Sequence, residues 1–287
     1  IDRVAALGRL WNPAPVLRRN VHKRYLLELA AAGVAVTPTA LVPRGATDSL
    51  RTLAAARGWR DVVLKPAVGA GSFDTHRVRD AATPEAQALF ARLVGERESL
   101  VQPYLDSVDD HGERALVWID GEFTHAVRKT PRFAADDEQV SPALPLAAAE
   151  RALGEHALEV ALRLAGVTAE DLLYARVDVA PDATGRPVLM ELELVEPSLF
   201  LLQSPQALQR FVAAIAARVL QVPVEQMAFR DGRIFCIDQP DKGVAFYRIA
   251  GMAQWSPSTL PEGGPGLRET VQWSPAQLTP PSDADEI

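Results

Sequence analysis

An Asp120-Gly121 pair separates two stretches, 114–119 and 122–127, that are rich in apolar and β-branched residues. Asp-Gly is one of the dipeptides that most readily adopt the positive φ angles of a two-residue hairpin turn. The pattern therefore predicts two antiparallel strands that meet at this turn. Any fold of this chain must accommodate that hairpin and bury one of its faces.

A second hairpin and a long helix are predicted farther along the chain. Residues 172–179 and 188–194 read as strands, and the turn residues 181–185 join them. The stretch from about 146 to 164 has helical periodicity and is followed by Gly166, a typical residue just past a helix end. The two predicted hairpins therefore flank one helix.

Charged side chains gather on one face of the second hairpin, because alternate residues of a strand share a face. If paired positions sum to 369, Asp178 lies opposite Glu191 and Arg176 lies opposite Glu193. Crowded carboxylates repel one another unless a cation lies among them, and oxygen ligands suit Mg²⁺ together with phosphate oxygens. Taken alone, the hairpin favours a plainer alternative, a solvated face on which Arg176 neutralises a glutamate.

The first half of the chain predicts alternating helices and strands around a glycine loop. Asn20 is a typical helix N-cap residue, and Thr83 followed by Pro84 marks another helix start. The predicted order is helix 20–32, strand 34–36, helix 48–57, strand 62–65, glycine loop 69–72, strand 75–78, helix 83–95 and strand 100–103.

Lys65 ends an apolar strand four residues before Gly69, where its ammonium could reach a phosphate held by the loop amides. The loop has no Gly-Lys-Ser/Thr sequence, so it is not a Walker loop, and it lacks the third glycine of a dinucleotide fingerprint. A tight connection between strands is the alternative. Lys23 lies in the first turn of its predicted helix, where the dipole favours anions, although a plain surface lysine is equally compatible with the sequence.

The stretch Gln102-Pro103-Tyr104-Leu105 ends a buried strand and could hydrogen-bond a flat heterocycle; a plain exit from strand to loop is the alternative. No Gly-x-Ser-x-Gly elbow occurs, and Cys236 has no nearby histidine in the sequence, so no nucleophile is predicted. The five histidines lack the spacing of a zinc site.

The 287 residues carry 30 Lys+Arg against 37 Asp+Glu, a net charge of −7. This acidic balance argues against nonspecific binding to nucleic acid or to anionic membranes, so any phosphate must be bound locally. One cysteine cannot form an internal disulfide, and no apolar run is long enough to span a membrane, which predicts a cytoplasmic protein.

Seven segments taken in order resemble the ATP-grasp superfamily. They are Lys23, 63–66, 69–72, 101–105, the hairpin at 120–121, 175–178 and 190–193. Within the superfamily the chain is similar to the glutathione-synthetase-like ligases, and in particular to the cyclo-ligases of D-cycloserine biosynthesis that close O-ureido-serine. Trp11-Asn12-Pro13 and the stretch 191–198 carry this second likeness. The resemblance covers roughly residues 9 to 219.

The resemblance implies an α+β fold in which two α+β subdomains clamp a nucleotide between mixed or antiparallel sheets. It implies ATP and Mg²⁺ as cofactors, with Mn²⁺ a further candidate. Its implied nucleotide-binding residues are Lys23, Lys65, Gly69, Gly71, Ser72, Gln102, Tyr104 and Leu105. Its implied metal ligands are Asp178, Glu191 and Glu193, although relatives often have Asn at the last position. Its implied catalytic residues, which face the transferred phosphate or the substrate carboxylate, are Arg176, Arg128 and Lys129.

The implied reaction is ATP-dependent phosphorylation of a carboxylate to an acyl phosphate, followed by attack of an amine on a small amino-acid-like substrate. Such chemistry needs positioning and cationic neutralisation more than a protein nucleophile, in keeping with the absence of one here. Two alternatives are a nucleotide-binding module without turnover and a phosphotransferase that uses the same cleft.

The expected organisation has four parts, and a homo-oligomer is a further expectation. Residues 1–20 are expected to be the remnant of a linker from a missing N-terminal domain, since relatives carry a domain before the first lysine. Residues 21–105 would form the small subdomain with the glycine loop, and residues 106–221 the subdomain with the metal site. Residues 222–287, which hold eight of the 22 prolines, form an unassigned tail unlike the family.

Overall fold

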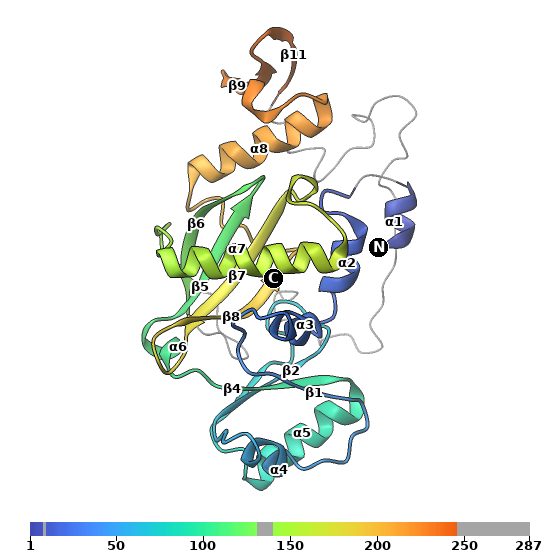
Figure 1. Cartoon of the computed structure of the whole chain (residues 1–287), viewed down its shortest axis with the longest axis vertical. Coiled ribbons are helices and arrows are strands. Elements are labelled where there is room, and N and C mark those ends of the chain that lie inside the picture. Colours follow the sequence, from blue (N-terminus) through green and yellow to red (C-terminus); the bar gives the residue numbers. More distant parts are fainter. Residues whose placement is uncertain (8–9, 131–139, 246–287) are drawn as a thin grey trace, which may run out of the picture.

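The computed structural model describes residues 1–7, 10–130 and 140–245. Three antiparallel sheets follow one another along the long axis of the molecule (Figure 1). Their strand orders are β1-β4-β2-β3, β6-β5-β7-β8 and β11-β10-β9. This combination of helices with antiparallel sheets confirms the predicted α+β class. None of the helices in the described ranges is long and apolar enough to cross a membrane.

The described strands are β1 (Ala40–Val42), β2 (Val62–Pro66), β3 (His76–Val78), β4 (Ser99–Pro103), β5 (Glu113–Ile119), β6 (Glu122–Lys129), β7 (Tyr174–Pro181), β8 (Pro187–Glu193), β9 (Met227–Arg230), β10 (Arg233–Cys236) and β11 (Gln239–Ala245). The described α-helices are α1 (Asp2–Leu7), α2 (Ala14–Asn20), α3 (Tyr25–Ala31), α4 (Leu50–Ala55), α5 (Pro84–Glu96), α6 (Ser107–Asp110), α7 (Ala148–Ala165) and α8 (Pro205–Leu220).

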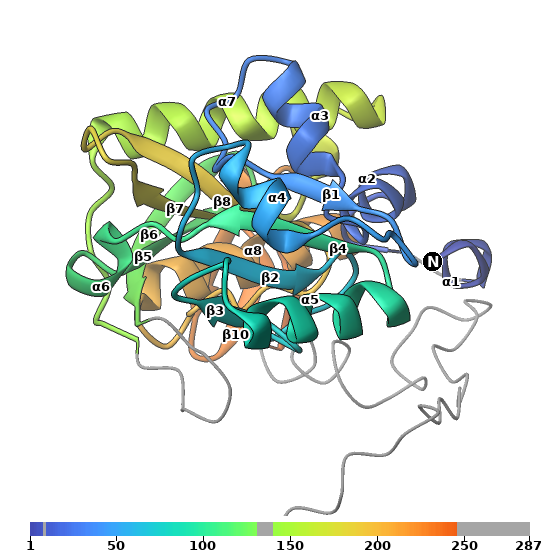
Figure 2. The same cartoon turned by 90° about the horizontal axis from the view of Figure 1, so that it is seen from below.

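The first sheet holds the strand that ends in the glycine loop. Its centre is the β2–β4 pair, with Lys65 opposite Leu100. Leu50 of α4 and Phe90 of α5 are buried in the hydrophobic cluster of this sheet. The predicted start of α5 is confirmed, because the Thr83 hydroxyl accepts a hydrogen bond from the first turn of the helix. Figure 2 shows α5 and α7 on opposite sides of the molecule.

The second sheet contains both predicted hairpins. Asp120 and Gly121 have φ angles of 45° and 98°, which confirms the turn between β5 and β6. α7 packs on this sheet so closely that a Cβ on Gly154 would lie 2.6 Å from the Phe123 ring. Gly166 ends α7 with a φ of 66°, as the sequence predicts.

The register predicted for the second hairpin is confirmed. Asp178 pairs with Glu191 and Arg176 pairs with Glu193. Leu192, which alternates with the two glutamates, is 1% exposed and lies in the core beneath the sheet. The charged side chains therefore occupy the opposite face of the hairpin from the core.

Two predictions for the segment before the first sheet are wrong. The predicted helix 20–32 is interrupted: α2 ends at Asn20 and α3 begins at Tyr25. Asn20 does not cap a helix, because its side chain hydrogen-bonds the backbone of β8 instead. The predicted strand 34–36 is a single parallel bridge between Val36 and Leu189.

The third sheet packs against α8. Ile234 of β10 shares a hydrophobic cluster with Val212 and Ile215 of α8 and with Leu173 at the base of β7. Met227 of β9 and Val244 of β11 also pack against this cluster. The proline-rich stretch 246–287 and the central part of the predicted loop 130–142, residues 131–139, lie outside the described residues.

Candidate active site

A cleft of about 560 Å³ runs between the first and second sheets. It is lined by the segment before α3, the end of β2, the glycine loop, the exit of β4 and the facing strands β6, β7 and β8. Thirteen of the fourteen predicted site residues line it, and Arg128 is the exception. The cleft also collects three of the four lysines in the sequence, Lys23, Lys65 and Lys129.

Lys23 and Lys65 reach the same carboxylate from different parts of the fold. Lys23 precedes α3 and forms an ion pair with Glu191 of β8, and its ammonium also donates to the Gly69 carbonyl at 3.0 Å. Lys65 Nζ lies 3.6 Å from the other oxygen of Glu191. Burial alone would raise the pKa of Glu191, but the charges of Lys65 and Lys23 outweigh it and lower that pKa. Glu191 is therefore an ionised carboxylate between two cations.

Asp178 is the most buried charged group of the second sheet, with 2% exposure. Arg176 binds it in a bidentate manner, with Nε–Oδ1 and Nη2–Oδ2 distances of 2.9 Å each. Lys129 Nζ lies 2.8 Å from Oδ2. Burial opposes ionisation of Asp178, but Arg176 and Lys129 hold its pKa well below the usual range.

Glu193 and Glu113 are the poorly compensated carboxylates of the cleft. Burial first, and then the neighbouring charge of Asp178, raise the pKa of Glu193 to about 8. Glu193 does form an ion pair with Arg176, but Asp178 already engages that guanidinium through two nitrogens. Glu113, beside Lys129, has its pKa raised to about 7, chiefly by burial. An additional cation would relieve this crowding.

Glu113, which lines the cleft, is not among the residues named from the sequence, whereas Arg128, which the resemblance implies to be catalytic, does not line it. A two-residue turn at 120–121 pairs residue 113 with residue 128 by simple counting. A β-bulge between Val117 and Trp118 shifts the register by one, so that Lys129 lies opposite Glu113. Arg128 points to the exposed side of β6 and donates to the Asp110 carbonyl at 2.7 Å, away from the cleft.

The glycine loop covers the lysine end of the cleft. Gly71 and Ser72 both have a φ of 59°, a left-handed conformation that suits the first residue and is uncommon for the second. Asp74 fastens the end of the loop, with its carboxylate 2.7 Å from His76 and 3.1 Å from Arg92 of α5. The loop is therefore held at both ends, since Lys23 binds Gly69 at the other.

The predicted adenine hinge lies at the exit of β4. Gln102 is 5% exposed, and its amide donates to the Thr39 hydroxyl at 2.8 Å. The Tyr104 ring stacks against the Arg77 guanidinium, 3.4 Å from the ring centroid. Its backbone N–H donates to the Asp61 carbonyl, so this N–H is not available to a ligand. Binding of adenine by Gln102, Tyr104 and Leu105 stays a prediction.

Thr37 is a polar residue in the wall of the cleft whose hydroxyl is buried. Thr37 is 2% exposed, donates its backbone N–H to the Leu189 carbonyl of β8 at 2.8 Å, and lines the cleft. Its hydroxyl has no hydrogen-bond partner within the part of the chain that the structure describes. A buried hydroxyl without a partner is costly, so this position is of interest both for stability and for binding.

Across the described ranges, no three His, Cys, Asp or Glu side chains form a ready cage for a metal ion. The carboxylate oxygens of Asp178 and Glu191 form ion pairs with lysine and arginine side chains instead. Mg²⁺ commonly binds through one or two carboxylates plus substrate phosphates rather than through an all-protein cage. The donor set therefore fits a metal that is shared with a nucleotide.

Comparisons with known proteins identify relatives of the chain. No protein-family model matches the chain. It is 37% identical over 227 residues to the cycloserine biosynthesis protein DcsG of Streptomyces lavendulae, covering 76% of each chain. The crystal structure of D-cycloserine synthetase DcsG matches with a TM-score of 0.68 and 36% identity, again over 76% of each chain.

A more distant structure shares the fold. D-alanyl-alanine synthetase A from Vibrio cholerae O1 biovar eltor str. N16961 matches with a TM-score of 0.53 and 15% identity, over 71% of this chain and 65% of that one. These relatives confirm the resemblance drawn from the sequence, and they do not favour a module without turnover or a phosphotransferase. The chain therefore belongs to the ATP-grasp superfamily, in the DcsG branch of ATP-dependent ligases that form C–N bonds.

Proposed function

We propose that the chain uses ATP and Mg²⁺ to convert a substrate carboxylate into an acyl phosphate, which an amine then attacks. The observation that carries this proposal is the convergence of Lys23 and Lys65 on Glu191 beneath the glycine loop. Two lysines aimed at one anion, with the glycine loop lining the same cleft, form a site that suits phosphate oxygens. Lys23, Lys65 and the loop Gly69–Ser72 would bind the phosphates of ATP.

The carboxylates of Asp178, Glu191 and Glu193 would hold the metal together with those phosphates. Support comes from the raised pKa of Glu193, which is caused first by burial and then by the neighbouring charge of Asp178. When bound, Mg²⁺ would neutralise the charge that develops on the transferred phosphoryl group. Mn²⁺ accepts similar oxygen donors and would be a substitute.

Arg176 and Lys129 are placed to neutralise the transferred phosphoryl group. Both are buried cations on the floor of the cleft. Within the described ranges, the Nη1 atom of Arg176 donates to the Ser198 carbonyl at 3.4 Å and not to a carboxylate, so this nitrogen is the least engaged by carboxylates. A substrate carboxylate oxygen would attack the γ-phosphorus and release ADP. The amine would then attack the carbonyl carbon and release phosphate, which keeps that carboxylate oxygen.

The candidate substrate follows from the relative. Because DcsG is described as a cycloserine synthetase, we propose a small amino-acid-like substrate for this chain, with O-ureido-serine as the first compound to test. Ring closure would place the carboxylate and the attacking nitrogen in one molecule, which removes the entropy cost of bringing two substrates together.

The single cysteine of the chain supports a cytoplasmic setting.

Hydroxylamine trapping tests the proposed intermediate. The protein is incubated with ATP, Mg²⁺, O-ureido-serine and hydroxylamine, and the hydroxamate is measured. We expect hydroxamate that depends on ATP and is lost in Lys65→Ala, but is retained in Lys242→Ala, which removes an exposed lysine of β11 outside the cleft. ADP formation with a phosphorylated product that resists hydroxylamine would contradict the acyl phosphate.

A further inference from the structure

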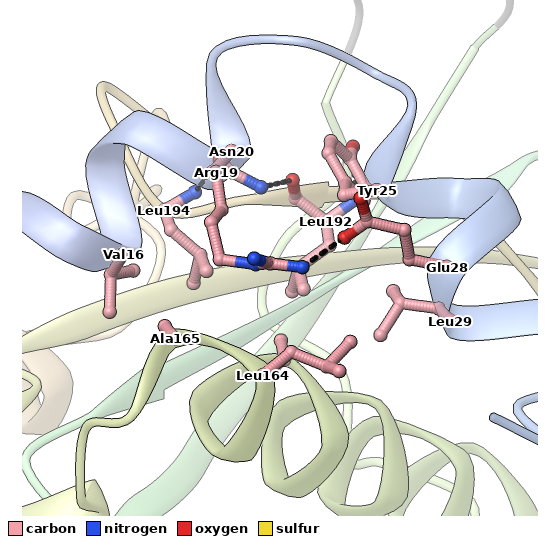
Figure 3. Close-up of a pocket in the computed structure, with 11 residues that line it drawn as sticks. Val16, Arg19, Asn20, Tyr25, Glu28, Leu29, Leu164, Ala165, Leu192 and Leu194 are labelled. Atoms are coloured by element: carbon pink, nitrogen blue, oxygen red, sulfur yellow. Dashed lines mark hydrogen bonds and ion pairs between the residues drawn. The ribbon is translucent and has the colours of Figure 1, made fainter.

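The outer edge of β8 is closed by side chains of the α2–α3 segment. Among the described residues β8 is the last strand of its sheet, so the outward N–H and C=O groups of Leu192, and of Leu194 directly after β8, face no further strand there. Asn20 donates to the Leu192 carbonyl and accepts from the Leu194 N–H, each at 2.8 Å. The Tyr25 hydroxyl accepts from the Leu192 N–H at 3.0 Å. Figure 3 shows Asn20 and Tyr25 directed at this edge, above α7.

Asn12 completes the set from the other end of α2. It is 1% exposed, and its amide nitrogen donates to the Leu194 carbonyl at 2.8 Å and to the Tyr174 carbonyl at 2.9 Å. Its oxygen accepts from the Leu173 N–H at 2.9 Å. All four outward backbone groups of Leu192 and Leu194 therefore have side-chain partners, as the ladder of a neighbouring strand would have provided.

This edge fixes the carboxylates that face the cleft. Successive side chains of a strand point to opposite faces, so Glu191 and Glu193 alternate with the buried Leu192 and Leu194. A rotation or slip of the strand at either leucine would move both carboxylates. Lys23 lies between Asn20 and Tyr25 in the sequence and pairs with Glu191, so the same segment also sets a lysine against that carboxylate.

We propose that Asn12, Asn20 and Tyr25 are positioning residues that hold Glu191 and Glu193 in the geometry that a divalent metal requires. The inference rests on the proposed function, because that function makes these glutamates metal ligands. It assigns the three side chains a role in metal affinity and metal selectivity. Partners that orient metal ligands typically contribute tenfold to hundredfold to affinity.

A comparison of Mg²⁺ affinity with Ca²⁺ affinity distinguishes a positioning role of these residues from a general effect on the stability of the protein. Mg²⁺ demands a near-ideal octahedral geometry, whereas Ca²⁺ accepts varied geometries. A displaced carboxylate therefore weakens the binding of Mg²⁺ more than that of Ca²⁺, while a general loss of stability weakens the binding of both.

The variants are Tyr25→Phe and Asn20→Ala, and the matched control is Thr124→Val. Thr124 donates to the Val117 carbonyl at 3.2 Å on the opposite edge strand of the same sheet.

The experiment measures Mg²⁺ and Ca²⁺ affinity by calorimetry on the full chain saturated with ADP, with thermal unfolding as the check on folding. We expect Tyr25→Phe and Asn20→Ala to weaken Mg²⁺ about tenfold, with a much smaller effect on Ca²⁺. The KM for Mg²⁺ should rise while kcat at saturating Mg²⁺ is retained, and Thr124→Val should match wild type. Asn20→Ala decides the matter if Tyr25→Phe does not fold.

Two results would overturn the inference alone, and a third would overturn it together with the proposed function. Unchanged Mg²⁺ affinity in a folded Asn20→Ala protein would refute the positioning role and leave the proposed function standing. An equal loss for Mg²⁺ and Ca²⁺ would also refute it, because such a loss reports stability rather than geometry. Wild-type protein that binds neither ADP nor Mg²⁺ would instead overturn the proposed function, and this inference with it.

Discussion

Lys23 binds Glu191 and the Gly69 carbonyl at the same time, so one ammonium joins strand β8 to the glycine loop. Lys65 approaches the same carboxylate from the other sheet. In the proposed reaction both lysines bind phosphate, and Glu191 is then free to bind the metal. Nucleotide binding is therefore an exchange of partners, in which Glu191 competes with phosphate for the two lysines until a metal is present.

This exchange predicts the behaviour of Glu191→Gln. Loss of the carboxylate charge should raise the affinity for ADP measured in EDTA, because the lysines no longer pair with an anion of the protein. The same variant should lose the extra affinity that Mg²⁺ gives to ADP. Calorimetry with and without Mg²⁺ measures both effects, and a fall in the metal-free ADP affinity would contradict the competition.

Lys65→Ala should weaken ADP binding strongly. A hydrogen bond to a charged group contributes about 1.5–3 kcal/mol, so the dissociation constant should rise roughly tenfold to hundredfold. Lys242→Ala is the matched control, because it removes a lysine that lies outside the cleft. If the two variants bound ADP equally well, Lys65 would have no place in the nucleotide site.

Glu193 should make the ligand-free protein less stable as the pH rises. Its pKa is raised from 4.5 to about 8, so the folded state favours the protonated form. This contribution to stability is fully present below pH 4.5, the ordinary value, and is lost as the pH rises through about 8. Glu193→Gln is neutral throughout, so its Tm should fall less than that of wild type between about pH 4.5 and pH 8. Parallel Tm curves would show that the pKa of Glu193 is ordinary.

Thr37→Val should stabilise the ligand-free protein. The substitution keeps the side-chain shape and removes a buried hydroxyl that lacks a partner among the described residues. An unsatisfied buried polar group costs about 1–3 kcal/mol, so the free energy of unfolding should rise by about 1 kcal/mol. Thr37→Ala, which leaves a small cavity, should not show this gain. A lower Tm in Thr37→Val would mean that the hydroxyl is hydrogen-bonded in solution.

The local patterns of the sequence were sufficient for much of the fold. The Asp120-Gly121 turn and the 369 register of the second hairpin both depend on neighbouring residues, and both are confirmed. A further signal was available in the rarity of lysine: three of the four lysines line the cleft, whereas the chain relies on arginine elsewhere. Lysine at a fixed point in an otherwise arginine-rich chain indicates a specific role.

Features that depend on tertiary contacts could not be predicted in this way. A β-bulge in the β5–β6 pair turns Lys129 toward the cleft and Arg128 away from it. Neither strand contains a glycine or proline from which this bulge could be predicted. Asn20 is a typical capping residue, but its side chain instead hydrogen-bonds the backbone at the outer edge of β8, more than 170 positions away in the sequence. Glu113 gains its raised pKa from burial and Asp178, which the sequence places far apart.

The central claim is transfer of a substrate carboxylate oxygen to phosphate, and isotope transfer measures it directly. O-ureido-serine labelled with ¹⁸O in its carboxylate is incubated with the protein, ATP and Mg²⁺, and the released phosphate is analysed by mass spectrometry. The account predicts ADP and phosphate in equal amounts, with one ¹⁸O atom in each phosphate. Unlabelled phosphate released together with the ligated product would contradict an acyl-phosphate mechanism.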